Sequence, residues 1–124
     1  MDQYINEIHP VAALEKVQNG AILLDVREWE ELEMLTFDVE GQLFIPLSEL
    51  GLRFQEIPKD REIIIGCNSG NRSMDAARYL KDRDFKLLYN LKGGIGSWIE
   101  YGLPVQWENI IPRKAIGNVN SIEI

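Results

Sequence analysis

The only cysteine of the 124-residue chain, Cys67, stands where a thiol could act as a nucleophile. It follows the apolar run 63–66 and precedes a polar loop that contains Gly70 and Arg72. The helix-like segment 73–80 comes next, so the thiol is predicted to lie at a strand-to-helix turn. Backbone N–H groups in such a loop, together with the free N–H groups of the first helical turn, stabilise an anion. The pattern therefore favours a thiolate with a lowered pKa.

A second interpretation is that Cys67 only packs in the core, because a free cysteine is commonly a small buried hydrophobic residue. The following loop favours the nucleophile. A cysteine that only packs in a buried strand needs no glycine at a position suited to positive φ, such as Gly70. Nor does it need a cation five residues further on, such as Arg72. The spacing by itself leaves both interpretations open.

Short apolar runs alternate with helix-like stretches along the chain, and this alternation favours a parallel α/β sheet. The expected strands are residues 21–24, 43–45, 63–66 and 87–89. Pro10 is expected to begin a helix that Asn19 and Gly20 end. Trp29, Leu32 and Leu35 recur every third residue, which predicts a short helix with one apolar edge.

Four blocks of the sequence, taken in order, resemble the rhodanese domain. They carry an Asp-x-Arg pair, an Ile-Pro turn, the cysteine loop and a Gly-Gly-x-Gly-x-Trp segment. The blocks occupy residues 24–28, 45–50, 67–73 and 91–98, with a Gly-Leu-Pro-Val stretch at 102–105. The resemblance implies an α/β, rhodanese-like fold, in which helices flank both faces of a central parallel β-sheet. We expect this domain to span residues 1–105.

The resemblance also implies a sulfurtransferase. Such an enzyme takes sulfane sulfur from a donor, either thiosulfate or a protein persulfide, and passes it to a thiol or protein acceptor. Cys67 would carry the sulfur as a persulfide, and Asp25 and Arg27 would help to hold the loop region or form a plain structural ion pair. The expected anion cradle around the sulfur consists of Asn68, Ser69, Gly70, Asn71, Arg72 and Ser73.

Two other functional classes stay open at this point. One is a rhodanese-fold interaction or regulatory module that has kept its cysteine but has little catalytic activity. The other is a small phosphatase, which the loop length disfavours. The related phosphatases have one more residue between the cysteine and the arginine, whereas four residues separate Cys67 from Arg72.

Neither a metal nor another cofactor is expected. A structural zinc site needs about four Cys or His ligands, and the chain contains one of each, Cys67 and His9. His9 is expected to be exposed or to cap the first helix. Trp98, at helical spacing from Ile95, is expected to pack in the core rather than to stack on a ligand.

The net charge of the chain and the absence of a recognisable signal segment indicate which partners and which compartment to expect. The net charge is −7, and residues 28–40 contain six acidic residues and no Lys or Arg, so nucleic acid is not expected to bind. The segment is either a solvated face or, if it borders the cysteine, a surface that repels a dianion and attracts a basic protein. We see no secretory signal or membrane segment and expect a cytoplasmic protein.

The last part of the chain is too apolar for a plain disordered extension. We expect residues 106–124 to form a C-terminal extension that packs on the domain or on the second subunit of a homodimer.

Overall fold

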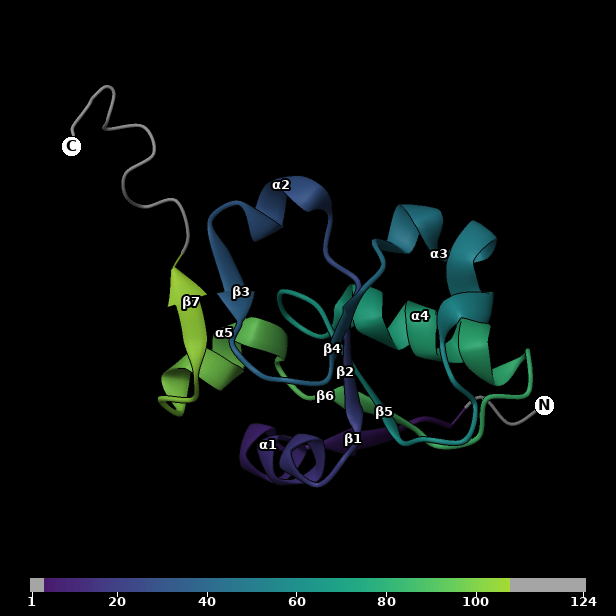
Figure 1. Ribbon diagram of the computed structural model, residues 1–124, viewed down its shortest axis with the longest axis horizontal. Coiled ribbons are helices and arrows are strands. Elements are labelled where there is room, and N and C mark those ends of the chain that lie inside the picture. Colours follow the sequence, from purple (N-terminus) through teal and green to yellow (C-terminus); the bar gives the residue numbers. More distant parts are fainter. Residues whose placement is uncertain (1–3, 108–124) are drawn as a thin grey trace.

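The computed structural model describes residues 4–107, which form a parallel β-sheet covered by helices (Figure 1). All four neighbouring strand pairs of the main sheet are parallel. Its strands lie in the order β1 (Asn6–Ile8), β6 (Leu88–Leu91), β5 (Ile63–Gly66), β2 (Ile22–Asp25) and β4 (Gln42–Phe44). The parallel α/β architecture expected from the sequence is confirmed.

Helices cover both faces of this sheet. A core cluster on one face includes residues of α1 (Pro10–Gln18) and α5 (Gly94–Glu100). The cluster on the other face includes residues of α3 (Leu47–Arg53) and α4 (Asn71–Lys81). Two shorter elements complete the helical part, α2 (Trp29–Leu32) and the 3-10 helix η1 (Phe54–Glu56).

The central strands β2 and β5 are apolar up to their last residues because both of their faces are buried. Leu23 and Ile64 point into the cluster that contains α1 and α5. Their neighbours Leu24 and Ile65 point into the cluster that contains α3 and α4. This two-residue alternation is the side-chain period of a strand, and continuous apolar runs are typical of parallel strands buried on both sides.

A second, antiparallel sheet corrects one expectation. The predicted helix through Trp29, Leu32 and Leu35 ends at Leu32, and Leu35 begins β3 (Leu35–Phe37). This strand pairs with β7 (Val105–Trp107), with Leu35 opposite Trp107. The pairing overrides the helical spacing, and a local pattern could not reveal it because the partner strand is distant in the sequence.

Three smaller predictions are confirmed. Helix α1 begins at Pro10 and has Asn19 as its C-terminal cap. His9 is exposed and caps α1, since its Nδ1 accepts a hydrogen bond from the Val11 N–H at 3.1 Å. Trp98 is fully buried, and its ring lies edge-on to Phe37 at a centroid distance of 5.1 Å.

The parallel register brings several strand ends to one edge of the sheet. Asp25, the last residue of β2, lies opposite Gly66, the last residue of β5. Cys67 therefore follows β5 next to the end of β2, and Asn90 of β6 lies opposite Ile65 on the other side. Within residues 4–107, no helix has the length and apolar character needed to cross a membrane.

The first residues of the expected C-terminal extension belong to a strand. Gln106 and Trp107 pair with β3, whereas residues 108–124 lie outside the described residues. Removing residues 106–124 should lower the melting temperature by roughly 4–8 °C, because losing the β3–β7 pairing removes about 1 kcal/mol of stability. Differential scanning calorimetry and gel filtration measure the melting temperature and the oligomeric state.

A chain shortened after Trp107 is the matched control, because it keeps β7 and loses only residues 108–124. If the chain ending at Val105 has the melting temperature and elution volume of the full chain, the extension is dispensable.

Candidate active site

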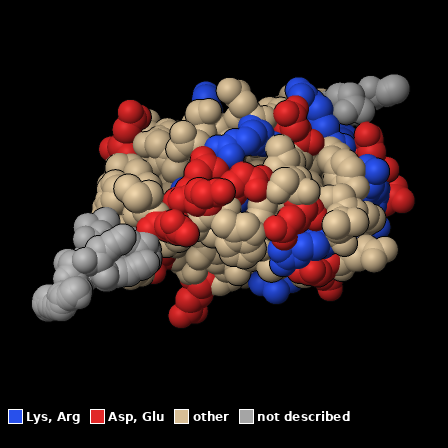
Figure 2. Space-filling view, turned by 90° about the horizontal axis from the view of Figure 1, so that it is seen from above, with Lys and Arg blue, Asp and Glu red and all other residues tan. Residues whose placement is uncertain are grey.

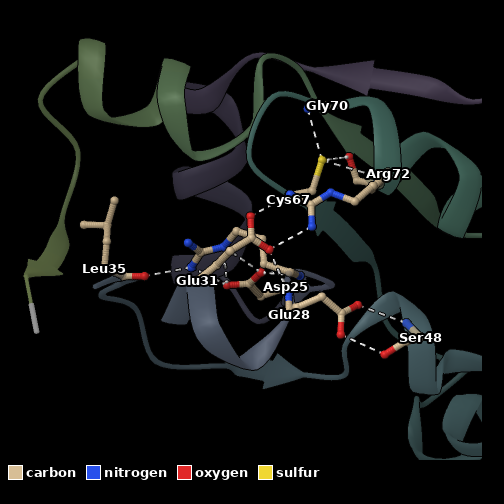
Figure 3. Close-up of polar contacts among 10 residues, drawn as sticks. Asp25, Glu28, Glu31, Leu35, Ser48, Cys67, Gly70 and Arg72 are labelled. Atoms are coloured by element: carbon tan, nitrogen blue, oxygen red, sulfur yellow. Dashed lines mark hydrogen bonds and ion pairs between the residues drawn. The ribbon is translucent and has the colours of Figure 1, made fainter. Parts of the chain in front are cut away.

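The sulfur of Cys67 lies inside the turn between β5 and α4, and backbone N–H groups surround it (Figure 3). The Gly70 N–H donates to Sγ at 3.1 Å, and the Ser73 N–H donates at 3.3 Å. Gly70 has φ = 104°, in the left-handed region, so the predicted need for glycine at positive φ is confirmed. Helix α4 starts directly after Gly70, and its positive end faces the same loop.

These contacts determine the ionisation of the thiol. Burial raises the pKa of Cys67, whereas hydrogen bonding with the Ser73 hydroxyl and the backbone N–H groups of Ser73, Gly70 and Ser69 lowers it, and the net shift is downward. The thiolate therefore stabilises the folded state above the unfolded-state pKa. That stabilisation is lost as the pH falls through the lower, folded-state pKa.

The other predicted cradle residues differ in their positions. Asn68, Ser69 and Asn71 are exposed, and of these three the backbone N–H of Ser69 hydrogen-bonds to the sulfur beside those of Gly70 and Ser73. Cys67 itself is 1 % exposed. The thiol is therefore almost completely shielded from solvent in this structure.

Arg72 makes an ion pair across the site. Its Nη1 and Nη2 donate to the two carboxylate oxygens of Glu31, both at 2.7 Å. The hydrogen bond with Arg72 lowers the pKa of Glu31, and the same bond raises that of Arg72. Arg72 also interacts electrostatically with Cys67. The partner of Arg72, Glu31, comes from the acidic segment noted in the sequence.

Glu31 is itself held by α2. Its Oε1 accepts the Glu28 N–H at 2.8 Å, and both carboxylates form a capping box at the start of α2. The Glu28 carboxylate in turn accepts the Ser48 hydroxyl at 2.7 Å. This chain of contacts links α2, which carries the partner of Arg72, to α3 (Figure 3).

Asp25 and Arg27 form a buried ion pair behind the loop. Arg27 Nη2 lies 2.8 Å from Asp25 Oδ2, and Nε donates to Oδ1 at 3.1 Å. Nη2 also donates to the Leu35 carbonyl at 2.9 Å. The pair therefore joins the end of β2, beside the end of β5, to the start of β3. Such a support role is what the Asp-x-Arg block predicted.

The start of α5 holds the loop from the opposite side. The Ile95 N–H donates to the Cys67 carbonyl at 2.8 Å, and the Gly96 N–H donates to the Asn68 carbonyl at 3.2 Å. Gly94 has φ = 60°, and a Cβ there would lie 2.4 Å from the Cys67 carbonyl oxygen. The glycines of residues 93–96, expected only as turn and packing residues, permit this close contact.

Sequence reasoning missed one buried polar residue at the site. Asn90, on β6, is fully buried and accepts a hydrogen bond from the Ser73 hydroxyl. The one feature of the sequence that could have pointed to Asn90 is that a polar residue interrupts an otherwise apolar strand. Within the described residues, no group of three or more His, Cys, Asp or Glu side chains is arranged to hold a metal ion.

Together, the sheet and the loop define a class of α/β protein that holds one thiol in a cradle of backbone amides at the carboxyl end of a parallel strand. Sequence comparison agrees with this geometry. The rhodanese-like domain family matches residues 10–101, and the chain belongs to this family.

The alignments with individual relatives cover most of this chain and most of each relative. A sulfurtransferase of Allochromatium vinosum is 33 % identical over 103 residues, which are 82 % of this chain and 94 % of the relative. The thiosulfate sulfurtransferase GlpE of Glaesserella parasuis is 30 % identical over 86 % of this chain and 97 % of its own. A rhodanese-related protein of Thermoplasma volcanium has a similar structure, with a TM-score of 0.69 and 33 % identity over 83 % of this chain and 99 % of its own. A family-level role as a rhodanese-type sulfurtransferase follows.

The ion pair of Arg72 leads to a prediction about the thiol. Arg72→Ala should raise the pKa of Cys67 by up to about 1, because the thiolate loses a nearby cation and the Glu31 carboxylate loses its partner. At neutral pH the thiolate fraction therefore falls. The ultraviolet absorbance of the thiolate, followed against pH, reports Cys67 alone among thiols because the chain has one cysteine.

Arg78→Ala is the matched control. Arg78 lies on the same helix, is exposed, and pairs with Asp75 at 3.6 Å, so its removal should leave the titration unchanged. Equal titration curves for Arg72→Ala and the parent chain would contradict the prediction.

Proposed function

We propose that this protein moves sulfane sulfur through a persulfide on Cys67 to a thiol or protein acceptor. The observation that carries the proposal is the pair of N–H groups, from Gly70 and Ser73, directed at the Cys67 sulfur. They favour an anionic sulfur at this position in either half of the cycle, as the thiolate or as the persulfide. The named activities of the relatives support the same reaction class.

The reaction can be written without an external oxidant. The Cys67 thiolate attacks the outer sulfur of the donor, the bond between the two donor sulfurs breaks, and the donor leaves with the electron pair of that bond. An acceptor thiolate then attacks the terminal sulfur of the Cys67 persulfide, and the Cys67 thiolate leaves. Both steps exchange one sulfur–sulfur bond for another, so the site needs anion stabilisation more than a general base.

The persulfide itself provides the test. After incubation with a sulfane-sulfur donor, intact-mass spectrometry should show a gain of one sulfur atom, ~32 Da, that a reducing thiol removes. Cys67→Ser should abolish the gain, whereas Arg78→Ala, on the exposed side of α4, should load like the parent chain.

The main alternative is an interaction module, and the low exposure of Cys67, 1 %, favours it. If Cys67 accepts sulfur from no donor and is alkylated only after denaturation, the cysteine is core packing and the interaction module replaces the enzyme. The enzyme needs Cys67 as a free thiol, and we therefore expect it to work in a reducing compartment such as the cytoplasm.

The charge around the cysteine loop bears on which donor the protein prefers. Acidic side chains gather across the middle of the face that carries α2 (Figure 2). Glu30 and Glu33, on or next to α2, are exposed, and Glu31 of the same helix reaches the cysteine loop through Arg72. We propose that a protein persulfide or small thiol persulfide is a better donor than thiosulfate, because the acidic side chains repel a dianion and attract a basic protein surface.

Thiosulfate turnover should accordingly be weak and should rise with salt. At a Debye length of about 8 Å, added salt screens part of the repulsion between the donor and the acidic side chains. The double variant Glu30→Gln/Glu33→Gln should raise kcat/KM for thiosulfate about threefold at low salt and reduce the salt effect. Steady-state thiocyanate formation with cyanide as acceptor measures both.

The double variant Glu15→Gln/Asp60→Asn removes the same charge from α1 and from the chain before β5, away from the loop. It should behave like the parent chain. If thiosulfate turnover is fast and does not depend on ionic strength, residues 28–40 are only a solvated face and do not affect the choice of donor.

A further inference from the structure

The Ser73 hydroxyl lies between two groups that compete for its single proton. Its Oγ is 3.3 Å from the Cys67 sulfur and forms a short hydrogen bond, 2.5 Å, to Oδ1 of Asn90. All three side chains are buried. A hydroxyl donates only one hydrogen bond, so Ser73 can donate to Asn90 or to the sulfur, but not to both.

The orientation of the Asn90 amide follows from its other neighbours. Its Nδ2 donates to Oε2 of Glu7 at 3.2 Å and to the Gly70 carbonyl at 3.2 Å. A carboxylate and a carbonyl only accept hydrogen bonds, so the amide nitrogen must face them and the amide oxygen must face Ser73. An amide oxygen also only accepts. The Ser73 proton therefore points at Asn90, and the lone pairs of Ser73 face the sulfur.

This arrangement suits a neutral thiol and not a thiolate. The Cys67 S–H can donate to the lone pairs of Ser73 across the 3.3 Å contact between the two atoms. A thiolate has no proton to donate, and it would face the lone pairs of Ser73 without a hydrogen bond. For Ser73 to stabilise the thiolate, its hydroxyl must rotate toward the sulfur and leave Oδ1 of Asn90, a buried acceptor, without that partner.

We propose that Asn90 is a positioning residue that competes with Cys67 for the Ser73 proton. In the thiol form Asn90 holds the proton, and in the thiolate form the sulfur takes it. The inference deepens the proposed function, since it assigns a control on the same nucleophile, but its test needs no sulfur donor. Asn90 also acts in the opposite direction, because its bond to the Gly70 carbonyl helps to keep the Gly70 N–H on the sulfur.

Other charged groups lie around the cysteine loop on the surrounding elements, and the test leaves them unchanged. Arg72 of α4 interacts with Cys67 electrostatically and is paired with Glu31 of α2. The buried pair of Asp25 and Arg27 lies at the end of β2. Glu7 of β1 approaches from behind Asn90, while α5 contacts the loop through backbone N–H groups.

A double-mutant cycle tests the competition. Asn90→Leu keeps the side-chain size, removes the acceptor and frees the Ser73 proton, so the pKa of Cys67 should fall by about 0.5–1. Ser73→Ala removes the hydroxyl, so the pKa should rise by a similar amount. In the Ser73→Ala background, Asn90→Leu should no longer lower the pKa. The ultraviolet absorbance of the thiolate against pH measures all four proteins, and circular dichroism confirms that each is folded.

The outcomes separate two roles of Asn90. A fall in pKa that depends on Ser73 supports the competition. If Asn90→Leu leaves the pKa unchanged or raises it, or if the fall persists without the Ser73 hydroxyl, Asn90 does not compete for the Ser73 proton and the proposal is overturned.

The parent chain offers a second measurement that needs no substitution at Asn90. At a pH where Cys67 is a thiol, its S–H stretching band in the infrared should lie at the lower frequency of a hydrogen-bonded donor. Ser73→Ala should move the band to the higher frequency of a free S–H. An identical band in the two proteins would overturn the inferred direction of the bond, whether or not Cys67 accepts sulfur.

Discussion

The cradle depends on how the carbonyl groups of the cysteine loop are satisfied. In a tight loop the N–H groups can point inward only if the carbonyl groups point outward and find partners there. The first N–H groups of α5 supply those partners, at Cys67 and Asn68. Gly94 allows the approach because any side chain at this position would collide with the Cys67 carbonyl. The anion site thus depends on hydrogen bonds between α5 and the loop carbonyl groups, which point away from the sulfur.

Two ion pairs then determine what surrounds the cradle. The buried pair of Asp25 and Arg27 ties the end of β2 to the start of β3. The second pair, Arg72 with Glu31, joins the loop to α2. Both guanidinium groups meet their carboxylates through two nitrogens. For the buried pair of Asp25 and Arg27, these hydrogen bonds offset the cost of burying two charges. The cation beside the thiol is therefore held in place by its own counter-ion.

The sequence predicted the parts of the site that are local. The apolar run before Cys67, the helix after it and the glycine at positive φ each follow from neighbouring residues. It could not predict the Ser73–Asn90 contact, because the two residues are 17 positions apart. Nor could it predict the partner of Arg72, which lies 41 positions away. Leu35 shows the same limit for the fold, since a helical spacing gave way to pairing with β7.

The origin of the site residues has a consequence for biosynthesis. Contacts around Cys67 come from β1 through Glu7, from α2 through Glu31, and from α5 through Ile95 and Gly96. On the ribosome, Cys67 emerges well before α5, so the carbonyl groups of its loop have no partners until that helix is synthesised. A nascent or unfolded chain accordingly carries an ordinary thiol. Completion of the domain is what assembles the hydrogen bonds around this cysteine, and the ionisation of its thiol is thereby coupled to the end of folding.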